Sequence, residues 1–147
     1  MSAATTTAVA PTDAQLYHEV QQFYAYQMQL LDDGAAQQWA TTFTEAGVFA
    51  ANAHPEPVRG RDAITAAAAR AIVELADKGI QRRHWLGMVH VTREGAAVRA
   101  RSYALVFETP KGGQAAVRMS TVCEDVLVHD GVGWLVAERY VTRDDLS

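Results

Sequence analysis

The chain of 147 residues is poor in cysteine, in long apolar runs and in positive charge, and each of these would point to a particular class of protein. Its single cysteine, Cys123, cannot form an internal disulfide, which favours a reducing, cytoplasmic location. No apolar run reaches the roughly 18 residues that a membrane helix needs. Lys and Arg number 13 against 17 Asp and Glu, a net charge of −4, and they form no basic run. We therefore expect neither a membrane nor a nucleic-acid partner.

The sequence patterns of metal and cofactor sites are also missing. The five histidines are scattered without the spacing of metal ligands, and there is no CxxC or HExxH motif. No glycine-rich phosphate loop follows a strand, and no GxSxG elbow is present. We expect a protein that holds no metal and uses no cofactor.

What is present is a chain of single-domain length, 49% hydrophobic and 20% charged, which can bury one substantial core. Residues 1–12 have neither the positive charge nor the apolar core of a signal peptide, and we predict a flexible tail there. The remainder, 13–147, is predicted to form one domain.

Helical periodicity dominates the first half of the chain. Apolar and aromatic residues at helical spacing predict a long helix over 13–33, which Gly34 ends. Similar patterns predict a short helix over 35–43 and a third over 61–78. A short strand over 47–52 is predicted between them.

After residue 80 the pattern changes to the alternation that is typical of strands. Short turns separate the alternating segments, so the strands must run antiparallel. Four strands are predicted, over 82–92, 97–108, 115–128 and 133–142. Helices followed by strands indicate an α+β fold, in which three N-terminal helices cover the concave face of a curved antiparallel sheet. Either a filled core or a pocket must lie between the helices and the sheet.

The first long strand carries the candidate acid–base residue. Alternation puts His84 and Met88 on one face, and Trp85, Val89 and Val91 on the other. A neutral histidine exchanges protons near physiological pH, so His84 is a candidate general acid or base, with a partly buried structural histidine as the alternative. The apolar residues of the opposite face predict an exposed patch and hence a homodimer.

Two carboxylates, Asp32 and Asp33, close the first predicted helix. Negative charge is unfavourable at the C-terminal end of a helix, which hints that one of them has another task. An aspartate beside a histidine orients the imidazole and stabilises its protonated form. The residues alone leave open which of the two turns inward, and a solvated helix end is the alternative for both.

Four runs of the sequence, in this order, resemble the SnoaL-like branch of the nuclear transport factor 2-like superfamily. They are YAYQMQLLDDGAAQQWATTFTEAGVF, VRGRDAI, RRHWLGMVHV and GGQAAVRMSTVCEDVLVHDGVGWLVAERYV, and the resemblance spans about residues 14–142. Within this branch the chain is similar to scytalone dehydratase-like proteins and to small proteins of aromatic polyketide pathways of the actinorhodin type. It is also similar to the small subunit of ring-hydroxylating dioxygenases.

The resemblance implies a cone around a central pocket, and a cofactor-independent dehydratase or cyclase that acts on an aromatic polyketide-type intermediate. Asp32 matches the aspartate that follows the first helix of the dehydratases, and His84 matches their pocket histidine. Their second pocket histidine has no counterpart here, and Leu31 replaces the tyrosine before their aspartate. The next strand offers Arg101 and Tyr103 instead, as groups that can polarise a substrate carbonyl.

A flat aromatic substrate needs apolar pocket walls, for which the sequence offers several large side chains. Ordinary core packing is the alternative for each of them. They are Tyr24, Trp39, Phe49, Met88, Tyr103 and Met119.

Two other functions stay open at this point. The pocket can bind or shield a pathway intermediate without catalysis, or the chain can be a structural small subunit of a dioxygenase with an iron-containing large partner. A homodimer is expected for the enzyme and for the binding protein.

Overall fold

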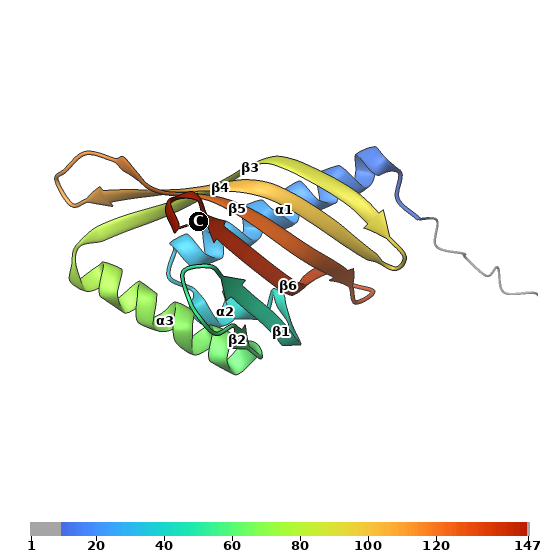
Figure 1. The fold of residues 1–147 in the computed structure, drawn as a ribbon, viewed down its shortest axis with the longest axis horizontal. Helices are drawn as coiled ribbons and strands as arrows, with labels where there is room; N and C mark the ends of the chain where they lie inside the picture. The colour runs from blue at the N-terminus through green and yellow to red at the C-terminus, as the bar shows by residue number, and fades with distance from the viewer. Residues whose placement is uncertain (1–9, 147) are drawn as a thin grey trace, which may run out of the picture.

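Three α-helices and a six-stranded sheet make up residues 10–146, which the computed structural model describes (Figure 1). The tail predicted over 1–12 lies outside the described residues except for its last three. The helices are α1 (Asp13–Asp32), α2 (Ala36–Ala40) and α3 (Arg61–Asp77). The strands are β1 (Phe43–Ala51), β2 (Val58–Arg59), β3 (Ile80–Glu94), β4 (Ala97–Pro110), β5 (Ala116–His129) and β6 (Trp134–Arg143), followed by the 3-10 turn η1 (Asp144–Leu146).

The strands form a single curved sheet in the order β2-β1-β6-β5-β4-β3. The four long strands β3 to β6 form the predicted antiparallel meander. β1 joins this meander parallel to β6, and the two-residue β2 pairs with β1 at the edge. Figure 1 shows α1 and α3 on the same side of the curved sheet. The predicted α+β class and the curved sheet are confirmed.

The longest helix, α1, has clear signals at both ends. At its start the Thr12 hydroxyl accepts from the backbone N–H of Gln15, and the Gln15 side chain accepts from the N–H of Thr12, a reciprocal capping box. At its end Gly34 adopts the left-handed conformation, with φ of 84°. Asp32 is therefore held at the last turn of α1. No helix among residues 10–146 combines the length and hydropathy needed to cross a membrane.

The region between α1 and α3 differs in detail from the prediction. The second helix is only one and a half turns long, because the buried Phe43 already belongs to β1 and lies opposite Val136 of β6. β1 consequently begins four residues earlier than predicted. The segment after β1, predicted as loop, includes β2, in which Arg59 pairs with Val48.

A β-bulge in β3 reverses the two faces of the strand after Gly87. The register with β4 shifts there, and Met88 has a positive φ of 51°. The additional residue turns Met88 to the outside, where it is 78% exposed, and turns Val89 and Val91 towards the core. The predictions that Met88 shares the face of His84, and that Val89 and Val91 face outward, are therefore wrong. They assumed unbroken alternation.

The hydrophobic core lies between the first half of α1 and the concave face of the sheet. Leu16 and Val20 of α1 belong to one buried cluster with Leu127 of β5 and Val136 of β6. The second half of α1 does not fill the remaining space, because α3 faces it with small side chains such as Ala68. A cavity is left at that end of the fold.

Truncating the core should cost much more stability than truncating the surface of the same strand. Leu127 is fully buried on β5, so Leu127→Ala should lower the free energy of unfolding by about 2–5 kcal/mol. Val117 on β5 is exposed, and Val117→Ala should change it by less than about 0.5 kcal/mol. Urea unfolding followed by tryptophan fluorescence measures both values. Equal stabilities of the two variants would contradict this account of the core.

Candidate functional site

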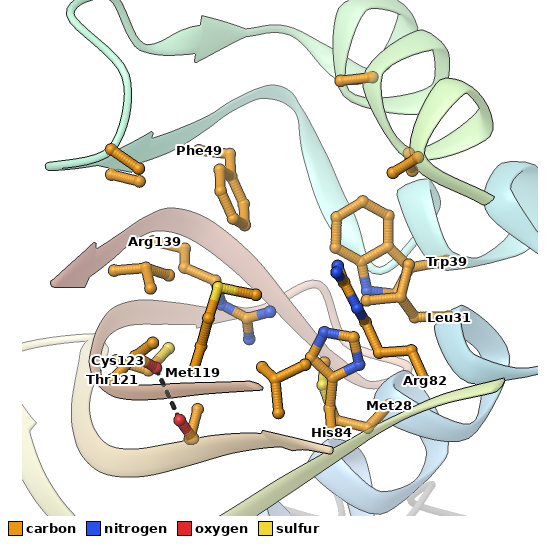
Figure 2. A pocket seen from close by; sticks show the side chains of 18 of the residues that line it. Met28, Leu31, Trp39, Phe49, Arg82, His84, Met119, Thr121, Cys123 and Arg139 are labelled. Atoms are coloured by element: carbon orange, nitrogen blue, oxygen red, sulfur yellow. Dashed lines mark hydrogen bonds between the residues drawn. The ribbon is translucent and has the colours of Figure 1, made fainter. Parts of the chain in front are cut away.

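A cavity of about 520 Å³ opens between the second half of α1, the helix α3 and the concave face of the sheet. Most of its lining is apolar. Trp39, Phe49 and Met119, three of the predicted pocket walls, lie on it, and the rings of Trp39 and Phe49 are 6.4 Å apart (Figure 2). Cavities of this size and composition are typical of sites for small organic ligands.

His84 and Asp32 meet at the wall of this cavity. The His84 Nδ1 lies 2.6 Å from Oδ1 of Asp32, and the backbone N–H of His84 donates to Oδ2 at 3.0 Å. Both oxygens of one carboxylate thus bind the same residue. The Asp32 side chain is only 7% exposed, whereas Asp33 is exposed.

This contact explains an acidic residue at the C-terminal end of a helix. The helix dipole disfavours a carboxylate there, and the two N–H groups of His84 compensate for it. Because Asp32 accepts from Nδ1, the other ring nitrogen, Nε2, carries the free lone pair of the neutral imidazole. Nε2 has no hydrogen-bond partner among the described residues, and Figure 2 shows the ring directed into the cavity.

A buried ion pair between β5 and β6 forms another part of the cavity wall. The Arg139 Nε donates to Oδ1 of Asp125 at 2.9 Å, and Nη2 donates to Oδ2 at 2.9 Å. The same Nη2 donates to Gln27 Oε1 at 2.7 Å, and the Tyr24 hydroxyl donates to Asp125 Oδ2 at 2.6 Å. Arg139 lines the cavity, and the other three side chains lie behind it.

The low-dielectric surroundings of this pair determine the charge states nearby. Burial, reinforced by Asp125, raises the pKa of Tyr24 well above its usual value. Burial also raises the pKa of Cys123, which lines the cavity as a neutral thiol. Burial alone would lower the pKa of Arg139, but the Asp125 carboxylate raises it, so the guanidinium remains a cation.

Four residues predicted to contact a substrate lie elsewhere. Tyr24 is buried in the network around Asp125. Met88, Arg101 and Tyr103 are exposed on the convex face of the sheet, and the Arg101 guanidinium lies 5.7 Å from the centre of the Tyr103 ring. In β4 the side chains alternate between the two faces, so Arg101 and Tyr103 point outward while the residues between and beside them point inward. Met88 points outward because of the bulge in β3. Arg101 and Tyr103 therefore cannot polarise a carbonyl inside the cavity.

The sequence interpretation missed three arginines that line the cavity, Arg82, Arg139 and Arg143. The sequence does contain a signal for Arg82, because it lies two residues before His84 on the same face of β3. Arg139 was not, because the register of β5 and β6 shifts between it and the start of β6. Among residues 10–146, no three His, Cys, Asp or Glu side chains gather closely enough to hold a metal ion.

Comparison with known protein families identifies one family that matches this chain. The SnoaL-like domain matches residues 12–140, most of the chain. None of the curated proteins matches at a significant level.

Several solved structures are similar over nearly their whole length. A protein from Catenulispora acidiphila, in complex with S-DNPA, is 39% identical with a TM-score of 0.78, covering 90% of this chain and 96% of that one. ActVI-ORFA from Streptomyces coelicolor is 33% identical with a TM-score of 0.81, covering 88% and 98%. Aln2 from a Streptomyces species is 32% identical with a TM-score of 0.84, covering 92% and 95%.

The β subunit of a putative aromatic-ring-hydroxylating dioxygenase from Novosphingobium aromaticivorans is also similar. It is 22% identical with a TM-score of 0.70, over 89% of this chain and 91% of that one. At this identity the likeness shows a shared fold alone.

Breaking the buried ion pair should destabilise the protein strongly. Asp125→Asn leaves the Arg139 charge buried without its partner, so the free energy of unfolding should fall by about 3–5 kcal/mol. Asp145→Asn removes an ion pair with Arg143 in which Asp145 is exposed, and should lower the stability far less, because solvent screens the pair.

Chemical unfolding of both variants measures these effects. Adding Arg139→Met to Asp125→Asn should recover part of the loss, since no buried charge is then left unpaired. An Asp125→Asn protein as stable as the wild type would show that the ion pair does not stabilise the fold.

Proposed function

Because the chain belongs to the SnoaL-like domain family of the nuclear transport factor 2-like superfamily, we propose that it catalyses acid–base chemistry in this cavity without a cofactor. The reaction is a dehydration or a cyclisation of an aromatic polyketide-type intermediate. The observation that carries the proposal is the contact of His84 with Asp32, 2.6 Å between Nδ1 and Oδ1, at the wall of a mostly apolar cavity.

In the dehydration of a β-hydroxy ketone, Nε2 of His84 first takes the proton from the carbon between the carbonyl and the carbinol. The electron pair of that C–H bond forms the enolate. As the enolate collapses, a C=C bond forms and the C–O bond breaks. His84 returns its proton to the departing oxygen, so that water leaves and the imidazole is neutral again. Asp32 acts as a positioning residue that fixes the tautomer and stabilises the imidazolium between the two steps.

Ring closure uses the same first step. The enolate carbon then attacks a second carbonyl of the same molecule, and His84 returns its proton to the new alkoxide. The alternative without chemistry, in which the cavity only binds or shields an intermediate, uses the same apolar walls and needs no mobile proton. The substrate class is supported by these walls and by the similarity to ActVI-ORFA and to the relative that binds S-DNPA.

We also propose a homodimer, formed through the convex face of the sheet. We call the exposed side chains Trp85, Met88, Tyr103 and Tyr140 the outer patch. Trp85 and Met88 belong to β3, and Tyr103 and Tyr140 project from β4 and β6 on the same face. Exposed apolar groups that share one face of a sheet are typical of protein interfaces.

Removing the imidazole should abolish most of the turnover. With an authentic pathway intermediate as substrate, His84→Ala should lower kcat by about 10²–10⁴-fold. Asp32→Asn should lower kcat by a smaller factor, because the imidazole remains but its tautomer is no longer fixed. Chromatographic measurement of product formation under saturating substrate gives both values.

His90→Ala is the matched control, since His90 belongs to the same strand as His84 but is exposed outside the cavity lining. It should keep the wild-type kcat. Unchanged turnover of a folded His84→Ala protein would overturn the mechanism. Binding of the intermediate without any turnover by the wild type would identify the non-catalytic function instead.

A charge placed in the outer patch should separate the protomers. Tyr103→Glu should convert the dimer into a monomer, because it replaces an apolar ring by a charge that the interface would have to desolvate. Val132→Glu, on an exposed turn outside the patch, should leave the dimer intact. Size-exclusion chromatography with light scattering measures the mass. A wild-type monomer at micromolar concentration would contradict the proposed interface.

A further inference from the structure

The charged side chains that line the cavity are unlike those of the protein as a whole. The chain has a net charge of −4, yet within the described residues the lining contains three arginines and two histidines and no aspartate or glutamate. Carboxylates outside the lining bind to the three arginines and to His84. The contacts are Arg82–Glu108 at 3.0 Å, His84–Asp32 at 2.6 Å, Arg139–Asp125 at 2.9 Å and Arg143–Asp145 at 2.8 Å.

This arrangement places basic side chains on the lining and keeps carboxylates off it. The Thr121 hydroxyl on the lining is itself committed to donate to the carbonyl of Ala104. A ligand with oxygen acceptors would meet donors on several sides. A ligand amine or ammonium group would find no carboxylate on the lining to receive it.

Arg82 is the arginine with the most unused donors. Its Nη2 donates to Oε1 of Glu108, whereas Nε is buried and has no acceptor among residues 10–146, and Nη1 has none there either. Arg82 and His84 are two residues apart on one face of β3, and Figure 2 shows both side chains on the same side of the cavity. Nε is enclosed by protein atoms, so Nη1 is the free donor to which an acceptor of a ligand can bind.

The other two arginines are more fully engaged. Arg139 uses Nε and Nη2 on Asp125 and Gln27. Arg143 binds both oxygens of Asp145 in a two-point contact, with Nε at 3.1 Å and Nη2 at 2.8 Å. Arg82 alone of the three holds its carboxylate through a single nitrogen.

We propose that the ligand of this cavity is an aromatic acid, and that its carboxylate binds to Arg82 while its apolar rings lie against Trp39 and Phe49. This deepens the proposed function, on which it rests, by naming the ionised group of the substrate. A guanidinium binds a carboxylate through charge-assisted hydrogen bonds, and the surrounding apolar wall strengthens them by excluding water. The carboxylate also anchors the substrate beside His84.

Arg82 can change partner without leaving a charge unpaired. Glu108 lies 3.6 Å from a second cation, Arg118 Nε, as well as 3.0 Å from Arg82. A ligand carboxylate that draws the guanidinium inward therefore leaves Glu108 with Arg118. For the same reason, replacing Arg82 does not isolate Glu108, and a variant at this position is expected to fold.

A matched pair of probes tests the assignment. 2-Naphthoate and 2-naphthamide have nearly the same shape and differ in charge. Isothermal titration with the wild type should show the acid binding at least about tenfold more tightly than the amide, the effect of one charge-assisted hydrogen bond. Arg82→Gln should abolish this preference, and Arg82→Lys, which keeps the charge, should retain part of it.

Arg101→Gln is the control, because Arg101 is exposed on the convex face near Glu124. It should leave the preference for the acid unchanged. Equal affinity of the wild type for the two probes, failure of the acid to bind, or an unchanged preference in Arg82→Gln would each overturn the proposal. These readouts do not involve turnover, so they are independent of the His84→Ala result. Acid selectivity together with an active His84→Ala protein would reject the catalytic proposal alone.

Discussion

The buried ion pair between Arg139 and Asp125 is the interaction on which the architecture of the cavity depends. It joins β5 to β6, and through Tyr24 and Gln27 it joins both strands to α1. Such a pair is stable only when its hydrogen-bonding groups are satisfied, which here requires the helix to lie in one position against the sheet. The Arg139 guanidinium also lies 5.5 Å from the centre of the Phe43 ring. The pair thus lies at the boundary between the packed core and the cavity.

The cavity depends on the small size of the side chains around it as well as on their charge. α3 presents alanines where a larger side chain would close the space, and the parallel strand β1 places Phe49 beside Arg139 in register. The resulting cavity has apolar walls, and its lining carries three arginines and His84, each of which binds to a carboxylate outside the lining. This arrangement keeps the cationic groups oriented while the carboxylates stay away from the ligand. Acid–base chemistry on an oxygen-rich aromatic molecule is compatible with these surroundings.

Much of the fold could be predicted because its signals are local. The alternation and short turns after residue 80 predict the antiparallel meander, and Gly34 predicts the end of α1. Counting alternate residues from the start of β3 also brings His84 and Arg82 to one face. The prediction failed where an irregularity broke the count. The bulge after Gly87 moved Met88 outward. Gly87 inside the alternating segment is the one local signal of a bulge there, and the prediction counted alternation straight across it.

The sequence by itself determined the order of the elements, the class of the fold and a histidine and an aspartate as candidates. Only the tertiary structure decided that these two side chains touch, and that Asp32 rather than Asp33 makes the contact. They are 52 residues apart, and their distance depends on how the end of α1 packs against β3. It also decided the parallel pairing of β1 with β6 and the inward direction of Arg139. Contacts between distant segments depend on packing and register across the whole sheet, and periodicity within one strand carries no information about them.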